Sequence, residues 1–174
     1  NTWLTTTDLV VSTFNTNFQI DPVITTLNNS NVVVVWSSFN QAGTNSLLDV
    51  YAKILSPAGA TVKNEFLVNQ FTSFNQRSPG VTALKNGGFA VVWVSEQQRV
   101  LAPMLGTNSP QYTSSSIVVP SVDIYARLFQ SDGTAGNEFI VNTNDSPCAN
   151  PAVATAADGS LMVSWSGRDM VNRV

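Results

Sequence analysis

The stretch Pro79–Trp93, PGVTALKNGGFAVVW, decides the fold, because the chain contains three versions of it. The other two are Pro22–Trp36, PVITTLNNSNVVVVW, and Pro151–Trp165, PAVATAADGSLMVSW. In every version the tryptophan follows the proline by fourteen positions and closes an apolar run. A fixed spacing in three copies indicates one structural unit that is repeated along the chain.

Each copy reads as a β-hairpin. Its two apolar runs are separated by Asn29-Ser30, Asn86-Gly87 or Asp158-Gly159. Asn-Gly and Asp-Gly are typical of tight hairpin turns, because both residues tolerate positive φ. We therefore predict a hairpin in each copy, with positive φ at both central positions of its turn.

Two further segments extend the repeat. Asp49–Leu55, DVYAKIL, matches Asp123–Phe129, DIYARLF, and Glu65–Asn69, EFLVN, matches Glu138–Asn142, EFIVN. Each segment reads as one more strand, so a full copy holds four strands, A to D. The copies cover residues 22–78, 79–150 and, incompletely, 151–174, and the second carries an inserted surface loop at about 100–120.

The beginning of the chain fits the same repeat. Asp8–Ser12 stands where a strand D would fall if the first repeat length is extended backwards. We therefore expect residues 1–21 to contribute the last strand of a preceding blade.

An antiparallel four-stranded unit repeated in sequence is typical of the blades of a β-propeller, and this is the fold class that we predict. The recurring tryptophans, with Tyr51 and Tyr125 of strand C, are expected to pack between neighbouring blades, because one blade cannot bury both of its faces. About three blades cannot close a ring. The chain is then a fragment of a longer polypeptide, half of an assembly whose partner supplies the other blades, or an open array of sheets.

The composition excludes several function classes. The chain has no histidine and one cysteine, which argues against histidine-dependent catalysis, an internal disulfide and a cysteine-based zinc site. Eight scattered Lys and Arg residues and a net charge of −3 argue against nucleic acid. The longest apolar run, Val32–Trp36, is far too short to span a membrane. No calcium-loop pattern of alternating Asp residues is present, and we expect no cofactor and no metal.

The runs Lys85–Trp93 and Asp123–Asn142 resemble a repeat of very large secreted and cell-surface proteins of bacteria and some protists. The resemblance covers nearly the whole chain outside the inserted loop, and many carriers of the repeat are adhesin-like. It implies an extracellular or cell-surface, non-catalytic, propeller-type module.

Candidate binding residues fall in the loops that join strand B to C and strand D to A. These loops emerge on one face of a propeller, and several of the few charges gather there. Arg, Asn and Gln side chains suit sugar hydroxyls and carboxylates. The predicted ligand-binding set is Asn75, Arg77, Glu96, Gln97, Arg99, Arg168 and Asp169. Asn28 and Asn144 begin Asn-x-Ser triplets and are predicted glycosylation sites.

The acids of strands C and D, Asp49, Asp123, Glu65 and Glu138, recur at equivalent positions. Active sites are asymmetric, so we expect these four residues to stabilise the blades. The leading hypothesis for function is adhesion or recognition of a glycan or a surface protein by the loop face, with other blades as structural partners. The alternatives are a structural subunit of an extracellular filament and a propeller enzyme that acts on a polysaccharide through two converging acids.

Overall fold

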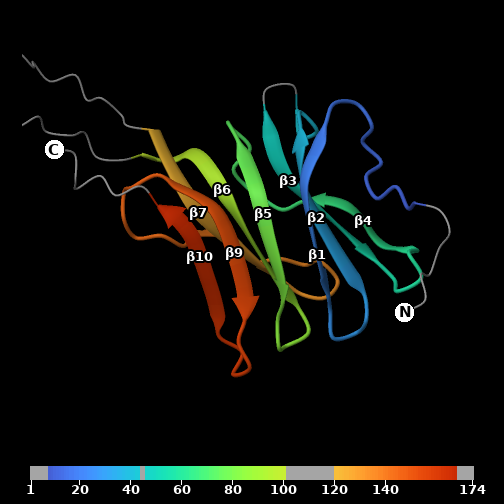
Figure 1. The fold of residues 1–174 in the computed structure, drawn as a ribbon. Coiled ribbons are helices and arrows are strands. Elements are labelled where there is room, and N and C mark those ends of the chain that lie inside the picture. The colour runs from blue at the N-terminus through green and yellow to red at the C-terminus, as the bar shows by residue number, and fades with distance from the viewer. Residues whose placement is uncertain (1–7, 44–45, 101–119, 168–174) are drawn as a thin grey trace, which may run out of the picture.

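The fold was established from a computed structural model, which describes residues 8–43, 46–100 and 120–167. These residues form ten strands in three antiparallel sheets and no helix, so none of them forms a helix that could cross a membrane. Figure 1 shows the sheets fanned side by side. The predicted all-β fold of propeller blades is confirmed.

The strands of each sheet follow one another in chain order. The first blade consists of β1 (Gln19–Thr26), β2 (Val32–Phe39), β3 (Leu48–Leu55) and β4 (Thr61–Leu67). The second consists of β5 (Gln76–Ala83), β6 (Phe89–Val100), β7 (Pro120–Phe129) and β8 (Phe139–Ile140). The third, in the described part of the chain, consists of β9 (Cys148–Thr155) and β10 (Leu161–Gly167).

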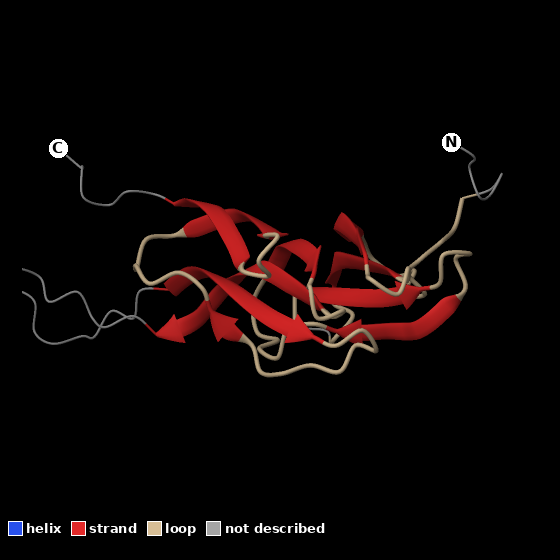
Figure 2. Ribbon diagram, turned by 90° about the horizontal axis from the view of Figure 1, so that it is seen from below, coloured by secondary structure: helices blue, strands red, loops and turns tan. Residues whose placement is uncertain are grey.

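The first strand of each sheet lies nearest to the first strands of the neighbouring sheets, and we call it the innermost strand. β1 contacts β5 and β5 contacts β9, so these strands lie side by side across the three blades (Figure 1). We call the end of the molecule at which β1, β5 and β9 begin the upper face; the loops from β2 to β3 and from β4 to β5 lie there too. The opposite end, the lower face, carries the tight turns that join the first strand of a sheet to the second and the third to the fourth. Figure 2 shows the same sheets from a perpendicular direction.

Neighbouring blades pack through two unlike faces. Val33, Val35 and Ile54 of the first blade are fully buried against the face of the second blade that carries Trp93 and Tyr125. The opposite face of the second blade packs in turn against Val153, Val163 and Trp165 of the third. A valine-rich face therefore meets a tryptophan face at both interfaces, as the sequence predicts, and the buried aliphatic surface is the main stabilising term.

The same turn closes five strand connections, and it differs from the one that the sequence predicts. In the first hairpin the N–H of Ser30 donates to the carbonyl of Leu27 over 2.9 Å, and only Ser30 has positive φ, 67°. Gly87, with φ of 93°, and Gly159, with φ of 94°, take its place in the other hairpins. The turn is a type I turn closed by one left-handed residue, so the prediction of positive φ at both central positions is wrong.

Residues 8–18 form no strand, so the strand predicted at Asp8–Ser12 is not found. A strand needs a partner along its edge, whereas this segment lies across the tryptophan face of the first blade. Lys53 Nζ donates to the carbonyl of Val11 over 2.8 Å, as Arg127 Nη1 of the second blade donates to that of Val68. The segment thus makes contacts that strand D makes in the next repeat.

The inserted loop is carried by a lengthened hairpin. β6 extends to Val100, which pairs with Pro120 at the start of β7, so both predicted ends of the loop belong to strands. The residues between them, 101–119, lie outside the described part of the chain. The fourth strand of the second blade is shorter than predicted, since β8 holds two residues and the neighbouring Glu138 bonds to the preceding blade instead.

Candidate functional site

The inner part of the upper face holds a compact cluster of Asn75, Arg77 and Glu96. Arg77 Nε and Asn75 Nδ2 each donate to a different carboxylate oxygen of Glu96, both over 2.8 Å. The Arg77 side chain is 32% exposed and the Glu96 side chain 21%, so the ion pair is reachable from solvent. Because β5 is an innermost strand, we call this group the inner cluster.

A bulge in each innermost strand aims residues at this region. The register of β5 against β6 shifts between Arg77 and Gly80, and Ser78 takes a positive φ of 54° directly before Pro79. Asp21, with φ of 53°, precedes Pro22 in β1, and Asn150, with φ of 50°, precedes Pro151 in β9. Such backbone conformations are unfavourable for these residues and are typical of positions where a side chain must be re-aimed.

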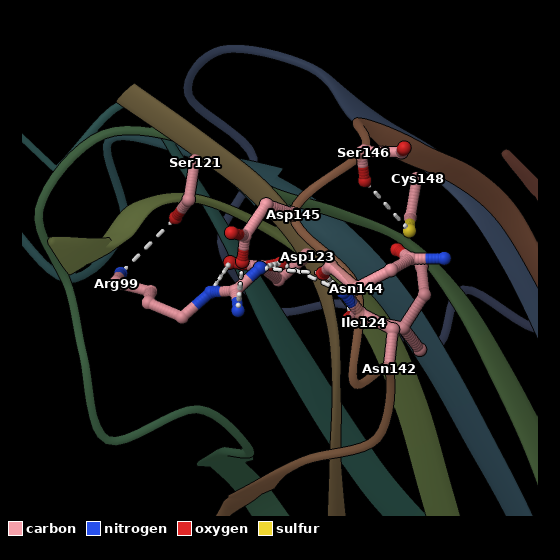
Figure 3. Close-up of polar contacts among 9 residues, drawn as sticks. All are labelled: Arg99, Ser121, Asp123, Ile124, Asn142, Asn144, Asp145, Ser146 and Cys148. Atoms are coloured by element: carbon pink, nitrogen blue, oxygen red, sulfur yellow. Dashed lines mark hydrogen bonds and ion pairs between the residues drawn. The ribbon is translucent and has the colours of Figure 1, made fainter. Parts of the chain in front are cut away.

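A second group, the outer cluster, lies between β6, β7 and the loop before β9 (Figure 3). Arg99 Nε donates to Asp123 Oδ2 over 3.0 Å and its Nη2 donates to Oδ1 over 2.6 Å. Its Nη1 donates to the exposed Asp145 over 2.8 Å, and Nη2 also reaches the carbonyl of Asn144. The Asp123 side chain is only 1% exposed, so Arg99 neutralises a buried charge.

Aspartate and asparagine form the same pair in both complete blades. Asn142 Nδ2 donates to Asp123 Oδ1 over 2.8 Å, and its Oδ1 accepts the N–H of Ile124. Asn69 Nδ2 donates to Asp49 Oδ1 over 2.7 Å in the first blade. These contacts join strand C to the end of strand D, which supports the predicted structural role of Asp49 and Asp123.

Two glutamates, Glu65 within β4 and Glu138 directly before β8, tie successive repeats together. Glu138 accepts the N–H groups of Gln70 and Phe71, which belong to the chain leaving the first blade. Glu65 accepts the N–H of Thr13 in the equivalent manner, and Gln41 Nε2 donates to it over 3.0 Å. Both acids serve the backbone, as expected for residues that repeat.

Burial and charge shift several pKa values at these clusters. Burial raises the pKa of Asp49, although its hydrogen bond from Asn69 acts in the opposite direction. Hydrogen bonding to Asp123 raises the pKa of Arg99. Burial, with the nearby charges of Asp49 and Glu65, raises the pKa of Tyr51 to about 12. Burial also raises the pKa of Cys148, whose Sγ lies 3.2 Å from the carbonyl of Ser146.

The predicted binding residues are therefore divided. The structure brings Asn75, Arg77 and Glu96 together, whereas Arg99 belongs to the outer cluster and is engaged by Asp123. Gln97 lies in the irregular part of β6 with a φ of 59°.

Arg168 and Asp169 lie outside the described residues. Asn28 and Asn144, the predicted glycosylation sites, are both exposed.

Two cavities of the described chain lie away from these clusters. One of about 470 Å³ is on the lower face between the turns of the second and third blades, lined by residues such as Lys85 and Asp158. Another of about 200 Å³ lies on the free face of the first blade, beside Val11 and Trp36. The first has one carboxylate in its lining and the second has none, so neither resembles a site with two acids.

Asp21 is a functional candidate that the sequence reasoning missed. It is exposed and stands on an innermost strand, at the position that Ser78 and Asn150 occupy in the other blades. The signal was present in the sequence as a polar residue before each repeat proline. Its meaning depends on the bulge, which the repeat pattern alone does not reveal.

Comparison with known proteins places the chain by fold only. No protein-family model matches it, and no curated protein matches its sequence. Among solved structures, that of an endo-arabinase from Bacteroides thetaiotaomicron, a β-propeller enzyme, matches with a TM-score of 0.51 and 16% identity. The match covers 91% of this chain and 55% of the other, so the chain spans about half the length of that structure.

This match corrects the functional prediction. The sequence favours a non-catalytic module for adhesion or recognition and predicts no enzyme. The structural neighbour is an enzyme, so the leading hypothesis and the absence of catalysis are contradicted, and the alternative of a polysaccharide-acting propeller has the better support. The resemblance to adhesin-like repeats, which rests on the strand pattern, holds for the propeller-like repeat alone.

Proposed function

We propose that the chain is part of a β-propeller enzyme that acts on a polysaccharide, and that the inner part of the upper face binds the substrate. The observation that carries the proposal is the solvent-accessible ion pair between Arg77 of the innermost strand β5 and Glu96 of the adjacent strand β6, in a fold shared with an endo-arabinase. This position suits a chain-like substrate, because the innermost strands of several blades can contact it together.

Glycoside hydrolysis commonly uses two carboxyl groups on either side of the scissile bond. Glu96 is the first candidate, since Arg77 and Asn75 hold both of its oxygens in place. Asp21 is the second, because it lies on the neighbouring innermost strand and is exposed. Asp49 and Asp123 are too deeply buried to touch a substrate and are assigned to the scaffold.

The test is hydrolysis of a panel of polysaccharides that includes arabinan, measured as the release of reducing ends. Glu96→Gln and Asp21→Asn should each lower kcat by roughly 10²–10⁴-fold, the usual contribution of a positioned acid or base. Asp132→Asn, a turn aspartate on the lower face, is the matched control and should keep the activity of the wild type. Activity on no polysaccharide, or full activity of Glu96→Gln, would refute the proposal.

We also propose that residues 1–21 contribute the last strand of a preceding blade once the other strands of that blade are present to pair with it, and that these other blades come from the same polypeptide or a partner chain. Support comes from the contacts of Val11 and Thr13, which repeat those of strand D in the next copy. Native mass spectrometry of the protein purified from its source should give a mass above the 18.7 kDa of the chain. A mass of 18.7 kDa would contradict this part of the proposal.

We propose that the protein lies outside the cell or on its surface, where it would meet an extracellular polysaccharide. Fractionation of the source cells should recover the protein in the medium or on the cell surface. Recovery from the cytosol alone would contradict it.

A further inference from the structure

The first and second blades differ at one buried polar site. In the second blade Ser95 Oγ donates to Gln98 Oε1 over 2.7 Å, and Asp123 Oδ2 accepts from Arg99. The equivalents in the first blade, counted from Trp36 and Tyr51, are Ser38, Gln41, Asp49 and, in place of Arg99, Ala42.

In the first blade the same three oxygen atoms are buried without a hydrogen-bond partner among the described residues. They are Ser38 Oγ, Gln41 Oε1 and Asp49 Oδ2. The side chains of Asn69 and Ser46 also lie beside the Asp49 carboxyl group, where both act to lower its pKa. Ser38 and Asp49 are 0% exposed and stand opposite one another in the β2–β3 register, so their side chains lie on the same face of the sheet. Gln41 is fixed from its other end, because its Nε2 donates to Glu65.

These atoms need a positive partner. A carboxylate and an amide oxygen only accept hydrogen bonds, and one serine hydroxyl can donate a single proton. An ionised carboxylate buried without a counter-charge is strongly unfavourable. In the second blade a cation, the guanidinium of Arg99, binds the equivalent carboxylate of Asp123, whereas the hydroxyl of Ser95 donates to Gln98.

We propose that the first blade binds a calcium ion through Asp49, Gln41 and Ser38, at the place that the Arg99 guanidinium occupies in the second blade. Calcium accepts carboxylate, amide and hydroxyl oxygens in irregular geometry and completes its shell with backbone carbonyls and water, whereas magnesium demands a near-ideal octahedron. The site holds one carboxylate and so differs from a cluster of three or more acidic or thiol ligands, of which the described residues contain none. Ala42, which stands in the place of Arg99, is exposed and its side chain provides no counter-charge.

The experiment measures thermal unfolding of the full chain in CaCl₂, MgCl₂, NaCl and KCl at constant ionic strength. Calcium should raise Tm with half-saturation at about 10⁻⁴–10⁻³ M, as for weak extracellular sites. MgCl₂, NaCl and KCl should leave Tm unchanged. Terbium, used as a calcium substitute, should give luminescence sensitised by Trp36, whose side chain shares the face of Ser38 and Asp49.

Two variants and one control decide the outcome. Asp49→Asn removes the charge, and Ala42→Arg supplies the missing guanidinium; both should lose the calcium response and the terbium signal. Asp132→Asn on the lower face should retain both. The proposal is overturned if calcium leaves Tm unchanged, if all four salts act equally, or if Ala42→Arg still responds. If Asp49→Asn fails to fold, the calcium response of Ala42→Arg still decides the test.

Discussion

Arg99 holds the buried carboxylate of Asp123 with two hydrogen bonds, of 2.6 and 3.0 Å, and so joins the end of β6 to the start of β7. The first complete blade has no equivalent of this pair, because Ala42 stands in the place of Arg99 there.

Removal of Arg99 should therefore destabilise the protein. Arg99→Ala leaves Asp123 charged and buried, and the free energy of unfolding should fall by about 3 kcal/mol, as measured by urea denaturation. The double variant Arg99→Ala/Asp123→Asn should recover most of the loss, since it removes the uncompensated charge as well. Asp145→Asn is the control: Asp145 is 73% exposed, and its loss should cost less than about 1 kcal/mol. Equal losses for Arg99→Ala and Asp145→Asn would show that Asp123 does not depend on Arg99.

Trp36, on the free face of the first blade, and Trp93, between the first and second blades, should differ in their coupling to glutamine. Trp36 Nε1 donates to Gln19 Oε1 over 2.9 Å, whereas Trp93 Nε1 and Gln76 Oε1 are both buried without a partner among the described residues. A double-mutant cycle of Trp36→Phe with Gln19→Met should give a coupling energy of about 1 kcal/mol. The matched cycle of Trp93→Phe with Gln76→Met should give a value near zero. A coupling of the same size in both cycles would contradict the difference in bonding.

Gly80 should be sensitive to any added side chain. A Cβ there would lie 3.0 Å from Val92 Cγ2 and 3.4 Å from the carbonyl of Pro151, at the contact between the second and third blades. Gly80→Val should destabilise the chain by about 1–3 kcal/mol through overpacking, and hydrogen exchange should accelerate first in β9 and β10. Gly136→Val is the control, because no heavy atom lies within 4 Å of a Cβ at that position. If Gly136→Val is as costly as Gly80→Val, close packing at Gly80 is not the cause.

Stability should fall in strong alkali. The folded protein raises the pKa of Tyr51 from 10.0 to about 12, and it also raises that of Tyr125. The folded state then holds these protons more tightly than the unfolded state, so stability is complete below pH 10 and is lost as the pH rises toward 12. Urea denaturation between these pH values should show the decline, and Tyr51→Phe should make it shallower. A wild-type profile that stays flat up to pH 12 would contradict the shift.

The repeat pattern is sufficient to predict the blades, because strand order and interblade tryptophans follow from the spacing of Pro22 and Trp36 and of their equivalents. The structural role of Asp49 and Asp123 was also accessible, since repetition itself argues against an asymmetric site. The missing strand at Asp8–Ser12 was not accessible, because strand formation depends on a neighbour along the edge. The grouping of Asn75, Arg77 and Glu96 depends on the bulge before Pro79, and the loss of a counter-charge at Asp49 depends on the single exchange of Arg99 for Ala42.

The unlike faces of each blade give the stack a direction. A valine-rich face fits a tryptophan face, and the free faces of the described chain, marked by Ile24 at one end and Met162 at the other, are of the two different kinds. A tandem gene duplication would therefore add a complete interface without altering an existing one. The same polarity favours a head-to-tail contact between copies, in which the two kinds of face meet, over a twofold-symmetric contact that pairs each face with its own kind.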